Sequence, residues 1–93
     1  MTPLAMAVWF MDDGGADYAG LAIQTHNFES EETELLVAAL AERFGIQART
    51  RANKGHRIIY IPYAQVGLLR AVIEPHILLE LRYKLVPRRE RTP

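Results

Sequence analysis

The feature that most constrains the fold is a short apolar helix near the start of the sequence, in the stretch TPLAMAVWFMDDGG at residues 2–15. Thr2 can cap free backbone N–H groups, and Pro3 suits the first helical position because its missing N–H costs nothing there. Residues 4–11 are then apolar without a break. A helix that is apolar on all sides must be covered on all sides, so it should contact its own domain and a second partner. It is far too short to span a bilayer.

Two acids and two glycines follow this apolar run, at Asp12, Asp13, Gly14 and Gly15. The macrodipole disfavours negative charge at the C-terminal end of a helix, so local stability does not explain the acids. The glycines suit a left-handed helix cap, which predicts that the helix ends here. A functional role for the acids therefore competes with a simpler interpretation, in which they only cap a loop.

A strand and a glutamate-rich helix are predicted next. Alternating residues up to Thr25 indicate a strand, and a turn at Ala19–Gly20 would complete a short hairpin. Ser30 is a candidate N-cap for the helix, and Gly45 suits its left-handed end. Glutamates in the first turn agree with the helix dipole, so we interpret them as an exposed helix start and not as a metal site. The predicted buried stripe consists of Leu35, Leu36, Ala39, Leu40 and Phe44.

A basic β-hairpin is predicted over residues 46–61, where the sequence pattern changes to a period of two. Residues 53–55 supply the turn, and residues 57–61 form the returning strand. Guanidinium groups at alternating positions of a two-stranded ribbon can read a DNA major groove, and an ordinary solvated strand face is the alternative. The candidate DNA contacts are Gln47, Arg49, Arg51, Lys54, His56 and Arg57.

The C-terminal third should contain another helix, over residues 62–75, bounded by prolines. An apolar segment with embedded bases follows at residues 76–85. We expect one domain over residues 1–86 and a flexible basic tail over residues 87–93. The buried stripe expected in the helix consists of Val66, Leu69, Val72 and Ile73.

The charges are unevenly distributed, although the 93 residues have a net charge of zero. Residues 1–46 carry eight acids and one base, which gives −7, whereas residues 47–93 carry ten bases and three acids, which gives +7. The basic half can meet phosphate groups. The sequence has no cysteine for a disulfide or thiolate metal site, and no glycine-rich phosphate loop. An intracellular location, in a bacterial cytoplasm or an organelle, is expected.

Several segments of the sequence resemble the LAGLIDADG homing endonuclease family, and they occur in the same order as in that family. MAVWFMDDG at residues 6–14 resembles its signature helix, with Asp13 as the acid before the closing glycine. The match is to the second half of single-chain members and extends over residues 2–85. The other matching segments are the Thr-His pair at residues 25–26, the glutamate-rich helix closing in Phe44-Gly45, the hairpin NKGHRIIYI at residues 53–61 and the ending EPHILLELRYKL at residues 74–85.

The resemblance implies an α+β fold of the order α-β-β-α-β-β-α, with an antiparallel DNA-binding sheet and the signature helix at a dimer or pseudo-dimer interface. It implies a site-specific double-stranded DNA endonuclease of the homing type, which uses Mg²⁺ and Asp13 from each of two signature helices. By position, it also places Lys84 near the scissile phosphate. A homodimer or a missing N-terminal half would supply the second helix, across Ala5, Val8 and Trp9.

Two other functions stay open. The first hairpin is shorter than the family pattern and the net charge is zero, which favours a non-cleaving nucleic-acid-binding module, such as a regulator or a splicing cofactor that binds intron RNA. The presence of Asp13 and Lys84 favours cleavage instead. The sequence also fits an inactive half of a two-motif endonuclease.

Overall fold

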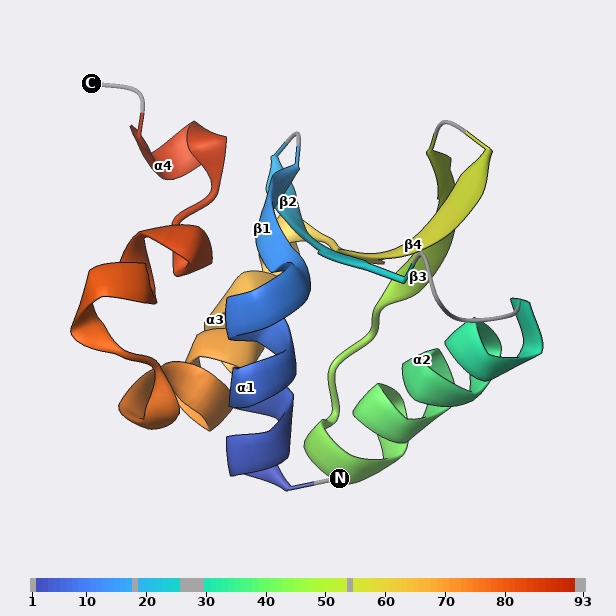
Figure 1. The fold of residues 1–93 in the computed structure, drawn as a ribbon, viewed down its shortest axis with the longest axis horizontal. Helices are drawn as coiled ribbons and strands as arrows, with labels where there is room; N and C mark the ends of the chain where they lie inside the picture. The colour runs from blue at the N-terminus through green and yellow to red at the C-terminus, as the bar shows by residue number, and fades with distance from the viewer. Residues whose placement is uncertain (1, 18, 26–29, 54, 92–93) are drawn as a thin grey trace.

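The computed structural model describes residues 2–17, 19–25, 30–53 and 55–91. Its helices and strands begin in the order α-β-β-α-β-β-α, which confirms the predicted α+β fold. Two 3₁₀ segments and a short helix follow. The elements, shown in Figure 1, are α1 (Pro3–Asp13), β1 (Gly14–Asp17), β2 (Gly20–Gln24), α2 (Ser30–Phe44), β3 (Arg49–Asn53), β4 (His56–Ile61), α3 (Tyr63–Ile73), η1 (Glu74–His76), η2 (Leu79–Leu85) and α4 (Arg88–Arg91).

The four strands form one antiparallel sheet in the order β1-β2-β4-β3. Figure 1 shows α1, α2 and α3 against one face of this curved sheet, while the two hairpins rise on either side of the other face. We call this second face the open face. Strand pairing and the alternation of side chains assign to it Gly15, Asp17, Ala22, Gln24, Arg49, Arg51, Ile58 and Tyr60.

The hydrophobic core lies between the helices and the inner face of the sheet. Alternate residues of the two central strands are fully buried there, namely Leu21 and Ile23 of β2 with Ile59 and Ile61 of β4. Because these strands are central and backed by helices, one complete face of them is apolar. The helices and the C-terminal segment contribute Met6, Ala7, Phe10, Leu40, Val66, Leu69, Ile73 and Leu85.

The start of α1 is as predicted, but its end is not. The Ala5 N–H donates to Thr2 Oγ1 (3.1 Å), so Thr2 is the N-cap. The left-handed cap predicted at the glycines is wrong, because Gly14 has φ −96° and begins β1 in an extended conformation. A Cβ atom on Gly14 would overlap the ring of Phe10. Glycine is therefore needed here for close packing of the strand on the helix, and not for a left-handed turn.

The first hairpin turns one residue earlier than predicted. Asp17 pairs with Gly20, so Gly20 is already part of β2 and the turn lies between them. A Cβ atom on Gly20 would overlap the carbonyl oxygen of Ile61 on the neighbouring strand. This close approach explains the glycine. Tyr18 and His26 lie outside the described residues.

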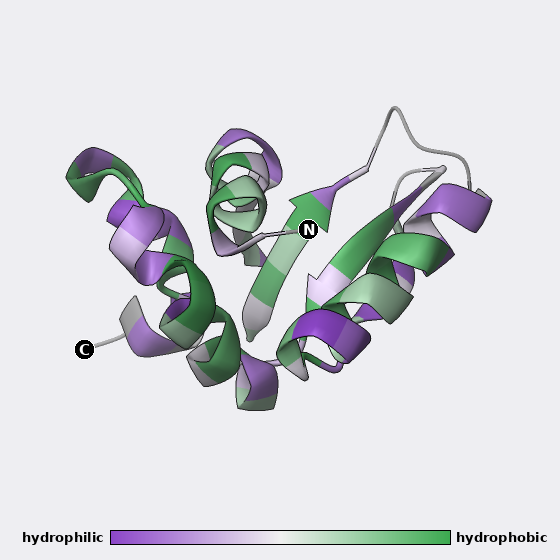
Figure 2. Cartoon of the chain, turned by 90° about the horizontal axis from the view of Figure 1, so that it is seen from below, coloured by the Kyte–Doolittle hydropathy of each residue, from purple (hydrophilic) through white to green (hydrophobic). Residues whose placement is uncertain are grey.

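The buried stripe of α2 differs from the predicted one. Leu35 is 71% exposed, whereas Thr33 is buried. The inward-facing residues follow helical spacing from this threonine and are Thr33, Leu36, Val37, Leu40 and Phe44. Hydrophilic residues occupy both ends of the helix (Figure 2). Gly45 has φ +70° and its N–H donates to Ala41 O (3.0 Å), which confirms the predicted left-handed end.

The second hairpin is confirmed, although β3 begins at Arg49 and not at residue 46. Gly55 has φ +84° in the predicted turn. The predicted helix is α3, in which Val66, Leu69 and Ile73 are buried. Within the described part of the chain, no helix is long and apolar enough to cross a membrane.

Residues 88–91, which we expected in a flexible tail, form the short helix α4. Glu90 of this helix is bound to Arg70 of α3. The boundary predicted between the domain and a tail stays a prediction.

Candidate functional site

The candidate site is a pocket where the C-terminal end of α1 meets the sheet. Asp13 is the last residue of α1 and is exposed. The pocket has a volume of about 160 Å³ and is formed mainly by small residues. Asp12, one position earlier, is exposed but is not among its lining residues. The lining residues are Asp13, Gly14, Gly15, Ala16, Asp17, Ala22 and Gln24.

Lys84 lies at the same end of α1. Its Nζ donates a hydrogen bond to Met11 O (2.6 Å), in the last turn of the helix. Carbonyl groups of a last turn lack partners within the helix, and a cation beside them is favourable. Lys84 therefore offsets part of the cost of Asp12 and Asp13 at this helix end. Lys84 therefore contacts the helix end that carries Asp13, but it is not among the residues that line the pocket.

An ion pair crosses the open face. Arg51 on β3 donates from Nη2 to Asp17 Oδ2 on β1, although β2 and β4 lie between these strands. The Arg51 guanidinium also stacks over the Tyr60 ring, with Cζ 4.7 Å from the ring centroid. Both charged side chains are partly exposed. The pair thus keeps a guanidinium group over the open face, beside the pocket that Asp17 lines.

The other predicted DNA contacts are spread over the second hairpin and its approach. Arg49 is exposed and pairs with Tyr60 on the open face. Gln47 is exposed but precedes β3, and its backbone N–H donates to the Gln65 side chain (2.9 Å). His56 begins β4, and its side chain lies outside the described residues, as does all of Lys54.

Arg57 lies on the opposite side of the sheet from Arg49 and Arg51. It pairs with Ala52, on the face that the helices cover. Its Nη2 donates to Thr50 Oγ1 (2.5 Å), which donates to Glu34 of α2 (3.3 Å). The structure therefore directs Arg57 toward the acidic helix and does not bring it together with the other candidate contacts.

The side of α1 that faces away from the core is apolar and exposed. Leu4 is 56% and Val8 47% exposed, and Ala5 is also exposed. Trp9, by contrast, is half-buried and packs against the core of its own domain. We call Leu4, Ala5 and Val8 the outer face of α1. Of the three predicted interface residues, Ala5 and Val8 lie on it, and Leu4 is an addition.

Sequence reasoning missed the two partners of Arg51. Asp17 belongs to a short strand and Tyr60 to an apolar one, so neither local pattern indicates a position beside Arg51 on the open face. The strand register brings both beside Arg51. Strict alternation from the buried Ile59 and Ile61 could have assigned Tyr60 to the open face. Asp17 had no comparable signal.

The structure has a helix that ends in an acid and packs beside an antiparallel sheet with one open face. This is the arrangement that the sequence resemblance implied. The sequence profile of the LAGLIDADG DNA endonuclease family matches residues 1–69. These residues make up most of the sequence, and the chain therefore belongs to the LAGLIDADG DNA endonuclease family.

Similar proteins agree with this assignment. The chain is 37% identical over 93 residues to "Probable intron-encoded endonuclease 1" of Wickerhamomyces canadensis, an alignment covering 92% of this chain and 40% of that protein. It is 32% identical over 88 residues to "Cytochrome b mRNA maturase bI2" of Saccharomyces cerevisiae, an alignment that covers 91% of this chain and 21% of that protein. Its fold matches that of the homing endonuclease I-WcaI bound to its DNA recognition sequence, with a TM-score of 0.87 and 36% sequence identity. The match covers 92% of this chain and 41% of the I-WcaI chain. The chain spans less than half the length of each.

Proposed function

We propose that this chain forms one half of a homing-type endonuclease, which cuts double-stranded DNA at a specific site with Mg²⁺. The observation that carries the proposal is the position of Asp13, at the end of α1 and in the pocket beside the open face, with Lys84 at the same helix end. A structural neighbour that binds DNA and shares this fold supports it. The open face would lie along the DNA, and the pocket would face the phosphate that is cut.

The donor set fits a metal that is shared with the substrate. Over the residues that the structure describes, no three His, Cys, Asp or Glu side chains form a metal cluster. Mg²⁺ commonly binds through one or two carboxylates together with substrate phosphates, so one Asp13 from each half and the DNA would suffice. When bound, the metal would stabilise charge on the phosphate oxygens and activate water. Lys84 would add a hydrogen-bond donor and a positive charge beside the scissile phosphate.

The outer face of α1 would contact the second half. Leu4 and Val8 lie one helical turn apart on the same face of α1 and expose apolar side chains. Ala5, between them, allows close approach of another helix. A homodimer would pair this face with itself and bring two Asp13 residues together, which would favour a palindromic target. A missing N-terminal half would use the same face. The relatives are more than twice as long as this chain, which is consistent with a missing N-terminal half.

The open face would contact the DNA through Arg49 and Arg51, with Gln47, Lys54 and His56 extending the surface along the hairpin. Arginine recognises guanine in the major groove and also binds phosphate. Arg57 was part of the same prediction, but its orientation toward α2 gives no support to a contact from this face.

Two substitutions on the open face should change DNA affinity in opposite directions. Arg51→Gln should weaken binding by about 1–3 kcal/mol, because a guanidinium contact is lost. Asp17→Asn should strengthen binding, because it removes an acid that competes with DNA for Arg51. Fluorescence anisotropy over a range of salt concentrations would measure both, with Arg57→Gln as a control on the other face. If Arg51→Gln binds DNA as tightly as the parent, and Asp17→Asn does not bind it more tightly, the pair has only a structural role.

A binding function without cleavage is the second candidate. The similarity to an mRNA maturase is the observation that favours it. Metal-independent binding of structured intron RNA, tighter than binding of any duplex DNA, would select this function.

The test of the proposal is cleavage of a randomised duplex library by a tandem fusion of two copies of the chain, which supplies two α1 helices without depending on association. We expect a specific, near-palindromic site to be cut on both strands with Mg²⁺ and to remain intact with EDTA. A folded fusion that binds duplex DNA but cuts no member of the library would contradict the proposal.

A further inference from the structure

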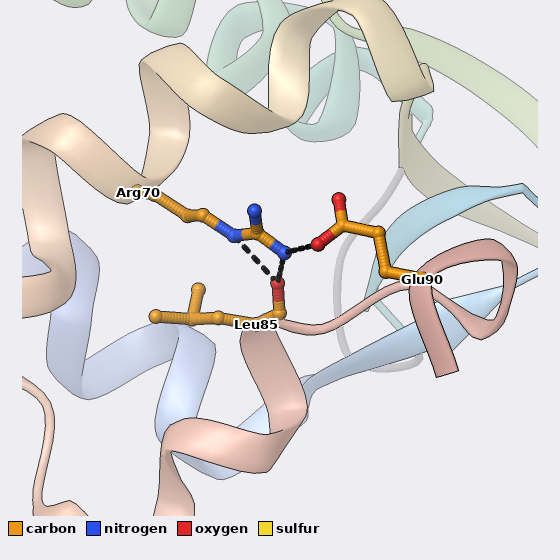
Figure 3. A network of polar contacts seen from close by, with 3 residues as sticks. All are labelled: Arg70, Leu85 and Glu90. Carbon is orange, nitrogen blue, oxygen red and sulfur yellow. Dashed lines mark hydrogen bonds and ion pairs between the residues drawn. The ribbon is translucent and has the colours of Figure 1, made fainter. Parts of the chain in front are cut away.

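Arg70 of α3 fixes the end of η2. Its Nε and Nη2 atoms both donate to the backbone carbonyl oxygen of Leu85, at 3.0 and 2.8 Å, and Nη2 also donates to Glu90 Oε1 at 2.8 Å. Figure 3 shows the guanidinium between these two acceptors. One side chain thus links α3, the last residue of η2 and the helix α4.

The Arg70 contacts supply what the end of η2 lacks. Carbonyl groups in the last turn of a helix have no donor within that helix, and a charged donor forms a stronger hydrogen bond than a neutral one. The Leu85 side chain is buried in the core, so this residue is held at both its side chain and its carbonyl group. The hydrogen bond from Arg70 lowers the pKa of Glu90, so this carboxylate stays ionised and holds the guanidinium in place.

Lys84 is the residue immediately before Leu85. Its ammonium group reaches Met11 O at 2.6 Å, two positions before Asp13. Ordering a lysine side chain costs rotamer entropy that is comparable to the net gain from one hydrogen bond, so the hydrogen bond alone does not fix the side chain firmly. The fixed backbone at Leu85 therefore determines where the Lys84 side chain starts.

We propose that Arg70 is a positioning residue, which holds the Lys84 ammonium against the end of α1 by fixing the Leu85 carbonyl. The inference rests on the proposed function where it assigns Lys84 a part in cleavage. Arg70 is not among the residues that line the pocket, and its hydrogen bonds to Leu85 and Glu90 reach none of them, so its effect passes through the backbone of η2.

Lysine labelling tests the positioning without DNA. The sequence has two lysines, Lys54 and Lys84, so Lys54 is an internal reference for acetylation followed by mass spectrometry. Arg70→Gln removes the charged donor from the Leu85 carbonyl, so the Lys84 ammonium should spend less time bound to Met11 O. The acetylation rate of Lys84 relative to that of Lys54 should therefore rise on the order of tenfold. Arg82 is also an arginine, but it is exposed on η2. Arg82→Gln is therefore the matched control and should leave the ratio of the Lys84 rate to the Lys54 rate unchanged. An unchanged ratio in Arg70→Gln would overturn the inference.

Further variants keep the result clear if Arg70→Gln lowers stability. Glu90→Gln removes the ion pair but leaves the Leu85 contact, so it should raise the labelling ratio by a smaller factor. Arg70→Lys keeps one charged donor and should restore part of the protection. Equal ratios in all three variants would contradict a role through the Leu85 carbonyl.

Cleavage kinetics of the tandem fusion then separate this inference from the proposed function. Arg70→Gln in both copies should lower the single-turnover cleavage rate and leave the dissociation constant for DNA unchanged, which loss of folded protein would not do. Equal loss of rate and affinity would overturn the positioning role. A parent fusion that never cuts DNA would contradict the proposed function, while the labelling ratio would still decide the role of Arg70.

Discussion

Asp13→Asn is expected to reduce cleavage by a factor of about 10³ or more, because a carboxylate that holds a catalytic metal contributes several kcal/mol to the transition state. Single-turnover cleavage of the tandem fusion, with the substitution in both copies, is the measurement. The asparagine has the same shape and leaves the pocket intact. Removal of an acid from the C-terminal end of α1 should keep the melting temperature or raise it slightly, since the helix dipole disfavours negative charge there.

Asp12→Asn is the matched control for this result. Asp12 has the same chemistry and the same helix end, but it does not line the pocket. We expect it to keep most of the cleavage rate. If Asp13→Asn cuts DNA as well as the parent, or if the two variants lose activity equally, the assignment of Asp13 as the metal-binding acid is wrong.

Val8→Glu is expected to abolish self-association of the single chain and the cleavage that depends on it. A glutamate on the outer face of α1 would be buried against a second helix, and burial of an unpaired charge costs several kcal/mol, so the dimer dissociation constant should rise roughly 10³-fold or more. Light scattering on a sizing column gives the mass. The same substitution in one copy of the tandem fusion should weaken cleavage less, because the linker keeps the halves together.

Leu35→Glu is the control for the charge itself. Leu35 is 71% exposed on α2 and is not part of the outer face of α1, so the same new charge should leave the mass unchanged. Trp9→Glu is a poorer test than Val8→Glu, because Trp9 packs on the core of its own domain and its loss would also destabilise the chain. A parent chain that is already a monomer at high concentration would contradict self-association.

Local sequence signals predicted the elements that depend on neighbours along the chain. Thr2 and Pro3 start α1, and Gly45 ends α2 in a left-handed conformation, as their cap chemistry requires. The period of two around Arg49 and Arg51 correctly placed both on one side of a strand. The family resemblance added the position of Asp13 at the end of a helix beside a sheet.

Features that depend on contacts between distant segments were missed. Gly14 is required by the Phe10 ring, although its position after two acids suggested a helix cap. Leu35 fitted the helical period, but α2 packs on the sheet at an angle that buries Thr33 instead. The pairing of Arg51 with Asp17 joins strands at opposite ends of the sheet order, which no local pattern encodes.

The Lys84–Met11 contact also has a consequence for the order of synthesis. The two residues are 73 positions apart, so the helix that carries Asp13 leaves the ribosome well before the lysine that offsets its charge. Proteins are made at about 5–20 residues per second, which leaves several seconds in which the acid end of this helix has no such cation. A nascent chain in that interval would carry Asp13 but not yet Lys84. Under the proposed function, DNA cleavage would therefore begin only after translation had passed Lys84.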